Sequence, residues 1–173
     1  KLAEHFDIPV ISFVDTPGAF PGIEAEERHV AEAIAVNLRE MATFNIPIIV
    51  IIIGEGGSGG ALGVAVADHV IILENAYYSV ISPEGCAAIL WKDRTFASQA
   101  ADALKIEGKQ LLNLGVVDQI LEEPIGGAHR DWETTSNTIS KSLENTLSIL
   151  SKTNDLISKR YDKFRIMGEF LTT

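Results

Sequence analysis

The sequence predicts an α/β protein with a parallel sheet, because strand-like apolar runs alternate with helix-like segments along its first half. Residues 9–14 and 46–53 are β-branched apolar runs, and an amphipathic segment lies between them. Strand-helix-strand units in succession favour parallel strands joined by right-handed crossovers. Ligands of such sheets bind at the carboxyl ends of the strands, so the loops after residues 14 and 53 are the first places to look for a site.

The first strand is predicted over Pro9–Val14, and the proline- and glycine-rich segment 15–22 forces a long turn after it. The segment 24–44 is predicted to be one helix. Apolar residues recur in it at helical spacing, and three glutamates lie near its dipole-positive end: Val30, Ile34, Leu38, Met41, Glu24, Glu26 and Glu27.

Residues 54–61 contain five glycines in eight positions, directly after the second apolar run. They are predicted to form a turn from that strand into a helix of small residues that starts near Ala61. Such a turn presents backbone N–H groups at a helix N-terminus without side chains in the way. A phosphate, a carboxylate or a developing oxyanion is therefore the ligand it suits.

Further strands are predicted over 69–73 and 77–81, and Ser82 followed by Pro83 marks a capped helix start. Residues 116–121 are predicted to be an edge strand, and a glycine-containing loop follows at 124–129. From Thr134 the sequence is polar and helical, which predicts helices that pack on the domain or on a partner.

Composition limits the classes of protein to which the chain can belong. The chain has 173 residues, 46% of them hydrophobic, which is enough for one globular domain with a sizeable core. A formal net charge of -10 argues against a general nucleic-acid surface. Cys86 is the single cysteine, so no internal disulfide is expected, and no Cys/His group has zinc-ligand spacing. No apolar run approaches the roughly 20 residues of a membrane span.

The first residues, Lys1–Phe6, have the pattern of the last turns of a helix already under way. We therefore expect a longer N-terminal portion with strands of its own.

The glycine segment allows two other functional interpretations and a structural one. Residues 54–59 match G-x-G-x-x-G, and Glu74 ends the next strand where a dinucleotide fold keeps its ribose acid. Residues 56–60 also match a G-x-S-x-G elbow, with Ser58 as nucleophile and Asp118 and His129 following in hydrolase order. The structural interpretation is close packing of strand and helix.

Four motifs in register resemble one family: residues 15–28 (DTPGAFPG with AEER), 54–61 (GEGGSGGA), 78–86 (YSVISPEGC) and 126–130 (GGAHR). The chain resembles the α subunit of the bacterial and plastid acetyl-CoA carboxylase carboxyltransferase, from Lys1 to about Phe170. The resemblance implies a crotonase-like (ClpP/crotonase) fold of repeated ββα units. It also implies a partial carboxyltransferase core over residues 1–130 and a C-terminal helical extension over 131–173.

The resemblance further implies that backbone amides stabilise the negative charge that develops during carboxyl transfer. Carried over by motif, the catalytic amides are those of Gly18, Ala19, Gly59 and Gly60, while Gly56 and Gly57 let the turn approach the substrate. Glu55 and Ser58 shape the turn. Negative charge on the ureido oxygen of biotin and on the enolate oxygen of acetyl-CoA then needs donors rather than a catalytic triad.

The partners that the resemblance implies are a carboxyltransferase β subunit in an α2β2 assembly, a biotin carboxyl carrier protein bearing carboxybiotin, and acetyl-CoA. The β subunit is expected to supply the zinc ribbon, with no metal in this chain. Malonyl-CoA formation for fatty-acid synthesis, in the bacterial cytoplasm or the plastid stroma, is the expected setting. The family resemblance also leads us to expect nucleotide and ATP binding.

Overall fold

The computed structural model describes residues 1–168 and contains one five-stranded sheet whose named strands all pair in parallel. The strand order is β1 (Val10–Thr16), β2 (Ile48–Gly57), β3 (His69–Leu73) and β5 (Gln119–Leu121). The short strand β4 (Tyr77–Ser79) pairs with the last residues of β2, after the part of β2 that pairs with β3. The parallel sheet that the sequence predicts is therefore present, and the strand at 69–73 has the predicted bounds.

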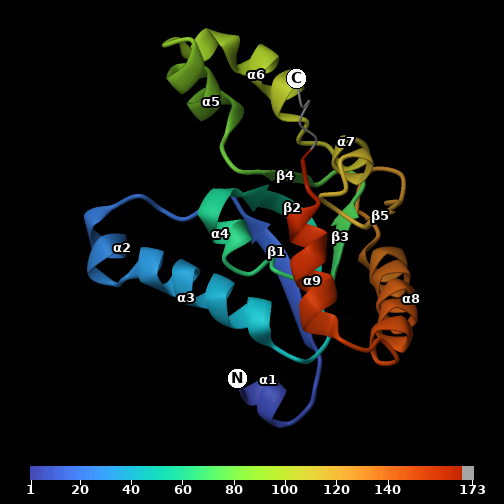
Figure 1. Cartoon of the computed structure of the whole chain (residues 1–173). Helices are drawn as coiled ribbons and strands as arrows, with labels where there is room; N and C mark the ends of the chain where they lie inside the picture. The colour runs from blue at the N-terminus through green and yellow to red at the C-terminus, as the bar shows by residue number, and fades with distance from the viewer. Residues whose placement is uncertain (169–173) are drawn as a thin grey trace, which may run out of the picture.

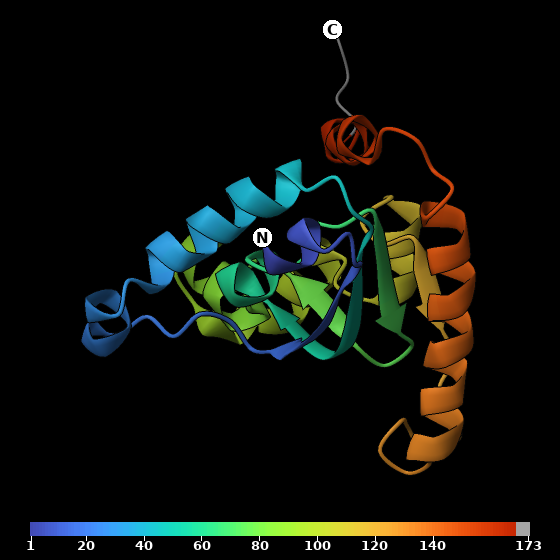
Figure 2. The same ribbon diagram turned by 90° about the horizontal axis from the view of Figure 1, so that it is seen from below.

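The helices lie around this sheet (Figures 1 and 2). They are α1 (Leu2–His5), α2 (Ile23–Glu27), α3 (Val30–Thr43), α4 (Ser58–Leu62), α5 (Pro83–Leu90), the 3-10 helix η1 (Arg94–Phe96), α6 (Ala97–Leu104), α7 (Gly108–Asn113), α8 (Trp132–Leu150) and α9 (Leu156–Arg165). Figures 1 and 2 show α3, α4 and α9 on one side of the sheet and α8 along its β5 edge, while α5 and α6 project from the body.

The centre of β2 lies in the middle of the hydrophobic core. Residues Ile48 to Ile52 are fully buried, and β1 and β3 flank them on either side. Burying a side chain of this size contributes about 1.5–3 kcal/mol. A strand that is buried on both faces carries apolar residues at successive positions, which explains why this run does not alternate with polar residues.

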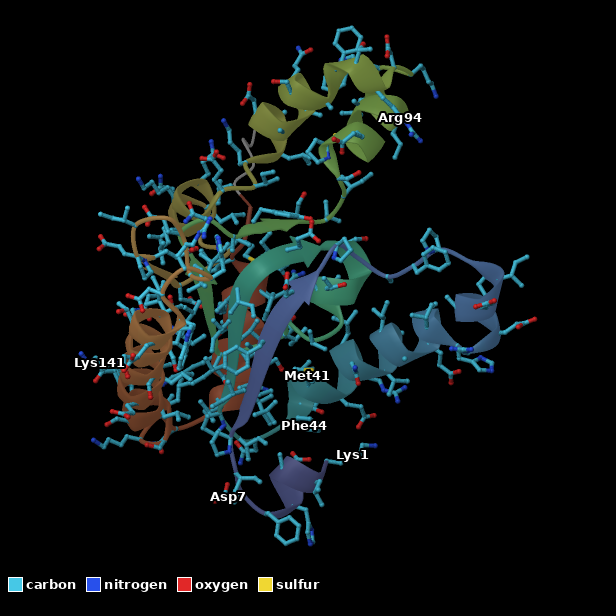
Figure 3. The ribbon with its side chains drawn as sticks, turned by 180° about the vertical axis from the view of Figure 1, so that it is seen from behind. Lys1, Asp7, Met41, Phe44, Arg94 and Lys141 are labelled. Carbon is cyan, nitrogen blue, oxygen red and sulfur yellow. The ribbon has the colours of Figure 1, made fainter. Side chains whose placement is uncertain are left out.

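One face of the sheet is only partly covered. Viewed from behind, no helix lies over β1 and β2 (Figure 3). In β1, Phe13 is 56% exposed and Ile11 is 37% exposed. The outer edge of β1 has no neighbouring strand within residues 1–168.

The C-terminal helix α9 is attached to the sheet by one buried ion pair and one more exposed ion pair. Arg160 is 2% exposed and donates to both carboxylate oxygens of Asp68. Lys163 pairs with Asp118, whose carboxylate also accepts the Val70 N–H. Asp68 and Asp118 stand just before β3 and β5, so both pairs lie at the amino ends of the strands.

The structure corrects several predicted boundaries. The strand expected over 77–81 ends at Ser79, and the strand expected over 116–121 begins at Gln119. The single helix expected over 24–44 is interrupted, because Arg28 ends α2 and His29 adopts a left-handed conformation with φ 57°. The turn expected at Gly54 begins later, since Gly54–Gly57 continue β2 and pair with β1 and β4. The helix expected from Ala61 begins at Ser58 and ends at Leu62.

The helix at Ser82 is present as predicted, with the Ser82 hydroxyl accepting the Gly85 N–H. In the C-terminal part, α8 packs on the main core and Ser142 donates to Gln119 of β5. A separate helical unit from residue 131 therefore stays a prediction, and residues 169–173 of that unit lie outside the described residues.

Candidate functional site

The loop after β1 and the turn after β2 meet at the carboxyl ends of these strands. The backbone of Gly60 is so close to the first loop that a Cβ atom on it would lie 2.8 Å from the Gly18 carbonyl carbon and 2.9 Å from the Ala19 nitrogen. A Cβ atom on Gly18 would lie 3.3 Å from Cβ of Ser58. Two segments about 40 residues apart in the sequence thus form one site, because parallel strands bring their carboxyl ends together.

The backbone of this site is unusual at two positions. Gly18 has φ +143°, a conformation that side chains rarely allow. Ser58 has φ +51°, which is uncommon for a residue other than glycine. This left-handed residue turns the chain sharply from β2 into α4, so that Gly59 and Gly60 follow in the first turn of the helix.

Three of the four predicted donor amides are free to bind a ligand. Within residues 1–168, the N–H groups of Ala19, Gly59 and Gly60 have no hydrogen-bond acceptor, and α4 has no side-chain cap. The Gly18 N–H is different, because it donates to the Thr16 hydroxyl at 3.3 Å. The first loop therefore offers Ala19 rather than Gly18 as the donor that is ready for an anion.

Gly56 and Gly57 are buried, and the protein itself requires them to be glycine. A Cβ atom on Gly56 would lie 2.7 Å from the Tyr77 carbonyl oxygen, and one on Gly57 would lie 2.0 Å from the Pro17 carbonyl oxygen. Close approach of β4 and of the first loop accounts for both residues without a ligand. These contacts bring the two loops together, and the part of Gly56 and Gly57 in substrate binding stays a prediction.

An apolar cavity of about 390 Å³ adjoins the turn. Ser58 and Gly59 line one part of it. Most of the remainder is apolar and comes from helices, strands and the segments that follow them, among them Leu62, Leu104, Leu111, Leu114, Val80, Phe164 and Met167. Burial raises the pKa of Tyr78, another lining residue, so its hydroxyl stays neutral over the physiological range. The sequence gives no signal of this cavity, because its walls come from distant segments.

The hydrolase triad is not assembled. Asp118 lies at the amino end of β5, where Lys163 and the Val70 N–H occupy its carboxylate. Ser58 lies beyond the carboxyl end of β2, and His129 is on the loop after β5, where its ring lies against Gly127. Asp118 is therefore not placed to complete a triad with Ser58, and no hydrogen bond between Ser58 and His129 is present within residues 1–168.

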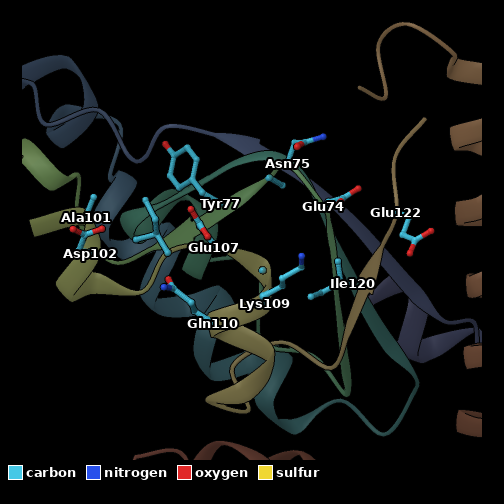
Figure 4. A pocket seen from close by; sticks show the side chains of 13 residues that line it. Glu74, Asn75, Tyr77, Ala101, Asp102, Glu107, Lys109, Gln110, Ile120 and Glu122 are labelled. Atoms are coloured by element: carbon cyan, nitrogen blue, oxygen red, sulfur yellow. The ribbon is translucent and has the colours of Figure 1, made fainter. Parts of the chain in front are cut away.

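The dinucleotide interpretation also finds no support in the geometry. Gly54, Gly56 and Gly57 lie in a strand and not in a strand-to-helix turn. Glu74 accepts the Glu123 N–H and lines a different, polar pocket of about 700 Å³, together with Asp102, Glu107, Lys109 and Glu122 (Figure 4). None of the residues 54–60 lines that pocket.

Residues 1–168 contain neither a metal-binding group nor a membrane-spanning helix. Over that part of the chain, no group of three or more His, Cys, Asp or Glu side chains is arranged to hold a metal ion. No helix there is both long and apolar enough to cross a membrane.

The fold and the two adjoining turns define an α/β domain with a candidate site at the carboxyl ends of its parallel strands, and the sequence comparison gives the family. The chain belongs to the acetyl co-enzyme A carboxylase carboxyltransferase-like family, which matches residues 1–168. It is 56% identical over 173 residues to the carboxyl transferase subunit alpha of acetyl-coenzyme A carboxylase from Geobacter sulfurreducens, covering 99% of this chain and 54% of the relative. The corresponding subunit of Protochlamydia amoebophila is 55% identical, with 99% and 55% covered. The chain thus spans about half the length of these relatives.

Two solved structures have folds similar to that of this chain. The transcarboxylase 12S hexamer with methylmalonyl-coenzyme A and methylmalonic acid bound has a TM-score of 0.73 at 18% identity, over 88% of this chain and 29% of that one. A Pseudomonas malonate decarboxylase hetero-tetramer in complex with coenzyme A has a TM-score of 0.69 at 18% identity, over 92% and 65%. The predicted crotonase-like fold is confirmed. Neither these proteins nor the described residues support nucleotide or ATP binding.

Proposed function

We propose that this chain is the α subunit of an acetyl-CoA carboxylase carboxyltransferase, which transfers the carboxyl group from carboxybiotin to acetyl-CoA and forms malonyl-CoA for fatty-acid synthesis. The observation that carries the proposal is the convergence of free amides from two loops. A Cβ atom on Gly60 would lie 2.9 Å from the Ala19 nitrogen, and the N–H groups of Ala19, Gly59 and Gly60 have no acceptor within residues 1–168.

Preorganised N–H groups suit a reaction in which negative charge develops on oxygen. One such donor contributes about 2.7–4 kcal/mol to lowering the barrier. Bound carboxybiotin would supply CO2, and the biotin anion left behind would take the methyl proton of acetyl-CoA, so that the enolate could attack CO2. Negative charge would therefore develop first on the ureido oxygen and then on the enolate oxygen. The amides of Gly59 and Gly60 bind that charge or the enolate oxygen of the thioester, and Ala19 adds a donor from the opposite loop.

The cavity beside Gly59 supports binding of the biotin group in this chain. It is mainly apolar and opens next to the donor amides, as the apolar ring system next to a polar ureido group requires. On this proposal the chain works with a β subunit, in an α2β2 assembly, and with a biotinylated carrier protein. Zinc belongs to the β subunit.

Substitution of Gly60 tests the proposal. The intact subunit is combined with its β subunit and the biotinylated carrier protein, and malonyl-CoA formation is measured. In Gly60→Val the side chain would have to enter space within 2.9 Å of Ala19 N and so separate the two loops. We expect kcat to fall by about 10²–10³-fold.

Ala33→Val is the matched control, because it places a valine on an exposed position of α3. We expect it to retain wild-type kcat. Wild-type kcat in a folded Gly60→Val subunit would remove these amides from the site, and failure of the reconstituted wild type to make malonyl-CoA would overturn the function itself.

A further inference from the structure

We propose that Asp15 is a positioning residue, which fixes the glycine segment of β2 against the loop after β1 and so aligns the donor amides of the two loops. The inference rests on the proposed function and names a residue that this function needs. Asp15 itself touches no reacting atom in this arrangement.

The argument begins with an irregularity in the sheet. β1 and β2 pair in step from Val10 with Ile48 to Val14 with Ile52, and pairing resumes at Thr16 with Gly56. One residue of β1, Asp15, therefore faces three residues of β2 (53–55). Residues inserted in this way have no backbone hydrogen-bond partner on the neighbouring strand, so backbone pairing does not fix the register of β1 and β2 at this point.

The Asp15 side chain replaces the missing ladder contact. Its Oδ1 atom accepts the Glu55 N–H at 2.9 Å. Gly54 leaves room for this carboxylate, since a Cβ atom there would lie 2.5 Å from the same oxygen. On the other side, Tyr77 pairs with Glu55 along the strand and its hydroxyl donates to Glu55 Oε1 at 3.3 Å.

This contact lies immediately before both functional segments. Asp15 is followed by Thr16 and the loop that carries Ala19, and Glu55 is followed by the turn that carries Gly59 and Gly60. A change of register at Asp15 would therefore shift one set of amides past the other. A misplacement of about 1 Å in such a site can cost about 10²-fold in rate.

The contact contributes more to alignment than to stability. Asp15 and Glu55 are both exposed, so water can satisfy the Glu55 N–H if the carboxylate is removed. Water does not hold the two strands in one register. A loss of kcat without a comparable loss of stability is consequently the signature of the positioning role.

The test uses the intact subunit with its β subunit and the biotinylated carrier, and measures kcat, KM for acetyl-CoA and the melting temperature. We expect Asp15→Leu to lower kcat by about 10- to 100-fold while KM stays within about twofold. Asp15→Asn keeps an acceptor oxygen and should restore most of kcat. Asp162→Leu removes an exposed acid from α9 as the matched control and should leave kcat unchanged.

Gly54→Ala perturbs the same contact from the other side. The added methyl group displaces only the end of the Asp15 side chain, so the subunit should fold even if Asp15→Leu does not. Its kcat should fall in the same way. The double variant should lose no more than the larger single effect, because both changes break one contact.

The positioning role is overturned if folded Gly54→Ala and Asp15→Leu both keep kcat within about twofold of wild type, or if Asp15→Asn is as slow as Asp15→Leu. An inactive Gly60→Val beside fully active Asp15→Leu and Gly54→Ala overturns this role alone. A wild type without carboxyl transfer overturns the proposed function and this role together.

Discussion

Removal of the Arg160 guanidinium group should destabilise the domain more than any other single change to α9. The side chain is 1% exposed and that of its partner Asp68 is 4% exposed. Besides the two bonds to Asp68, the guanidinium donates to the Phe44 carbonyl oxygen at 2.9 Å and to the Ile46 carbonyl oxygen at 3.0 Å. A further bond, of 2.9 Å, reaches the Met41 carbonyl oxygen near the end of α3.

Arg160→Met fills similar space but leaves the Asp68 carboxylate buried with the Ile48 N–H as its remaining donor. Breaking a buried ion pair by removing one partner costs about 3–5 kcal/mol. For a domain of this size, 1 kcal/mol corresponds to about 2–4 °C in melting temperature. We therefore expect a decrease of about 6–20 °C.

Urea unfolding followed by circular dichroism measures the free energy of unfolding directly. Arg165→Met, at an exposed position of the same helix, is the matched control and should change it by less than about 0.5 kcal/mol. Adding Asp68→Asn to Arg160→Met should recover part of the loss, since it removes the unpaired buried charge. A loss below about 1 kcal/mol for Arg160→Met would refute the reasoning.

Two further predictions concern Glu123 and Ser58. Burial tends to raise the pKa of Glu123, but the N–H groups of Asn75 and Ala128 donate to its carboxylate and hold the pKa below the usual 4.5. Because the folded pKa is the lower one, the carboxylate stabilises the protein above pH 4.5 and this contribution is lost as the pH falls through the folded pKa. Glu123→Gln should therefore lower the free energy of unfolding at neutral pH, with a difference from wild type that shrinks on acidification; a difference independent of pH in urea titrations would contradict this. Separately, a fluorophosphonate probe should leave Ser58 unmodified, and an adduct found there by mass spectrometry would revive the hydrolase interpretation.

Much of the architecture could be predicted because local signals agreed with it. The apolar run before Gly54 is buried on both faces, so its composition indicated a central parallel strand. Ser82 and Pro83 define a helix start by short-range hydrogen bonding, which is visible in the sequence. The two loops at the carboxyl ends of β1 and β2 could be paired in advance because parallel topology places such ends side by side.

Other features depended on contacts that no local pattern contains. The helix expected over 24–44 breaks at His29 without a proline or a glycine to signal it. Gly54 to Gly57 suggested a turn, yet they belong to β2, because the first loop and β4 approach too closely for side chains. The contact of Asp15 with Glu55 likewise had no signal in the sequence, since it arises from a bulge between strands far apart in the chain.

The sequence alone determined the α/β class and the two loops of the candidate site, because apolar runs and glycine-rich turns are local patterns, and four motifs in register indicated the family by resemblance. Tertiary structure decided which amides are free, with Gly18 engaged by Thr16 while Ala19, Gly59 and Gly60 remain available among residues 1–168. It also decided the apolar cavity beside Gly59 and the buried Arg160. These depend on the relative placement of distant segments, and packing sets that placement.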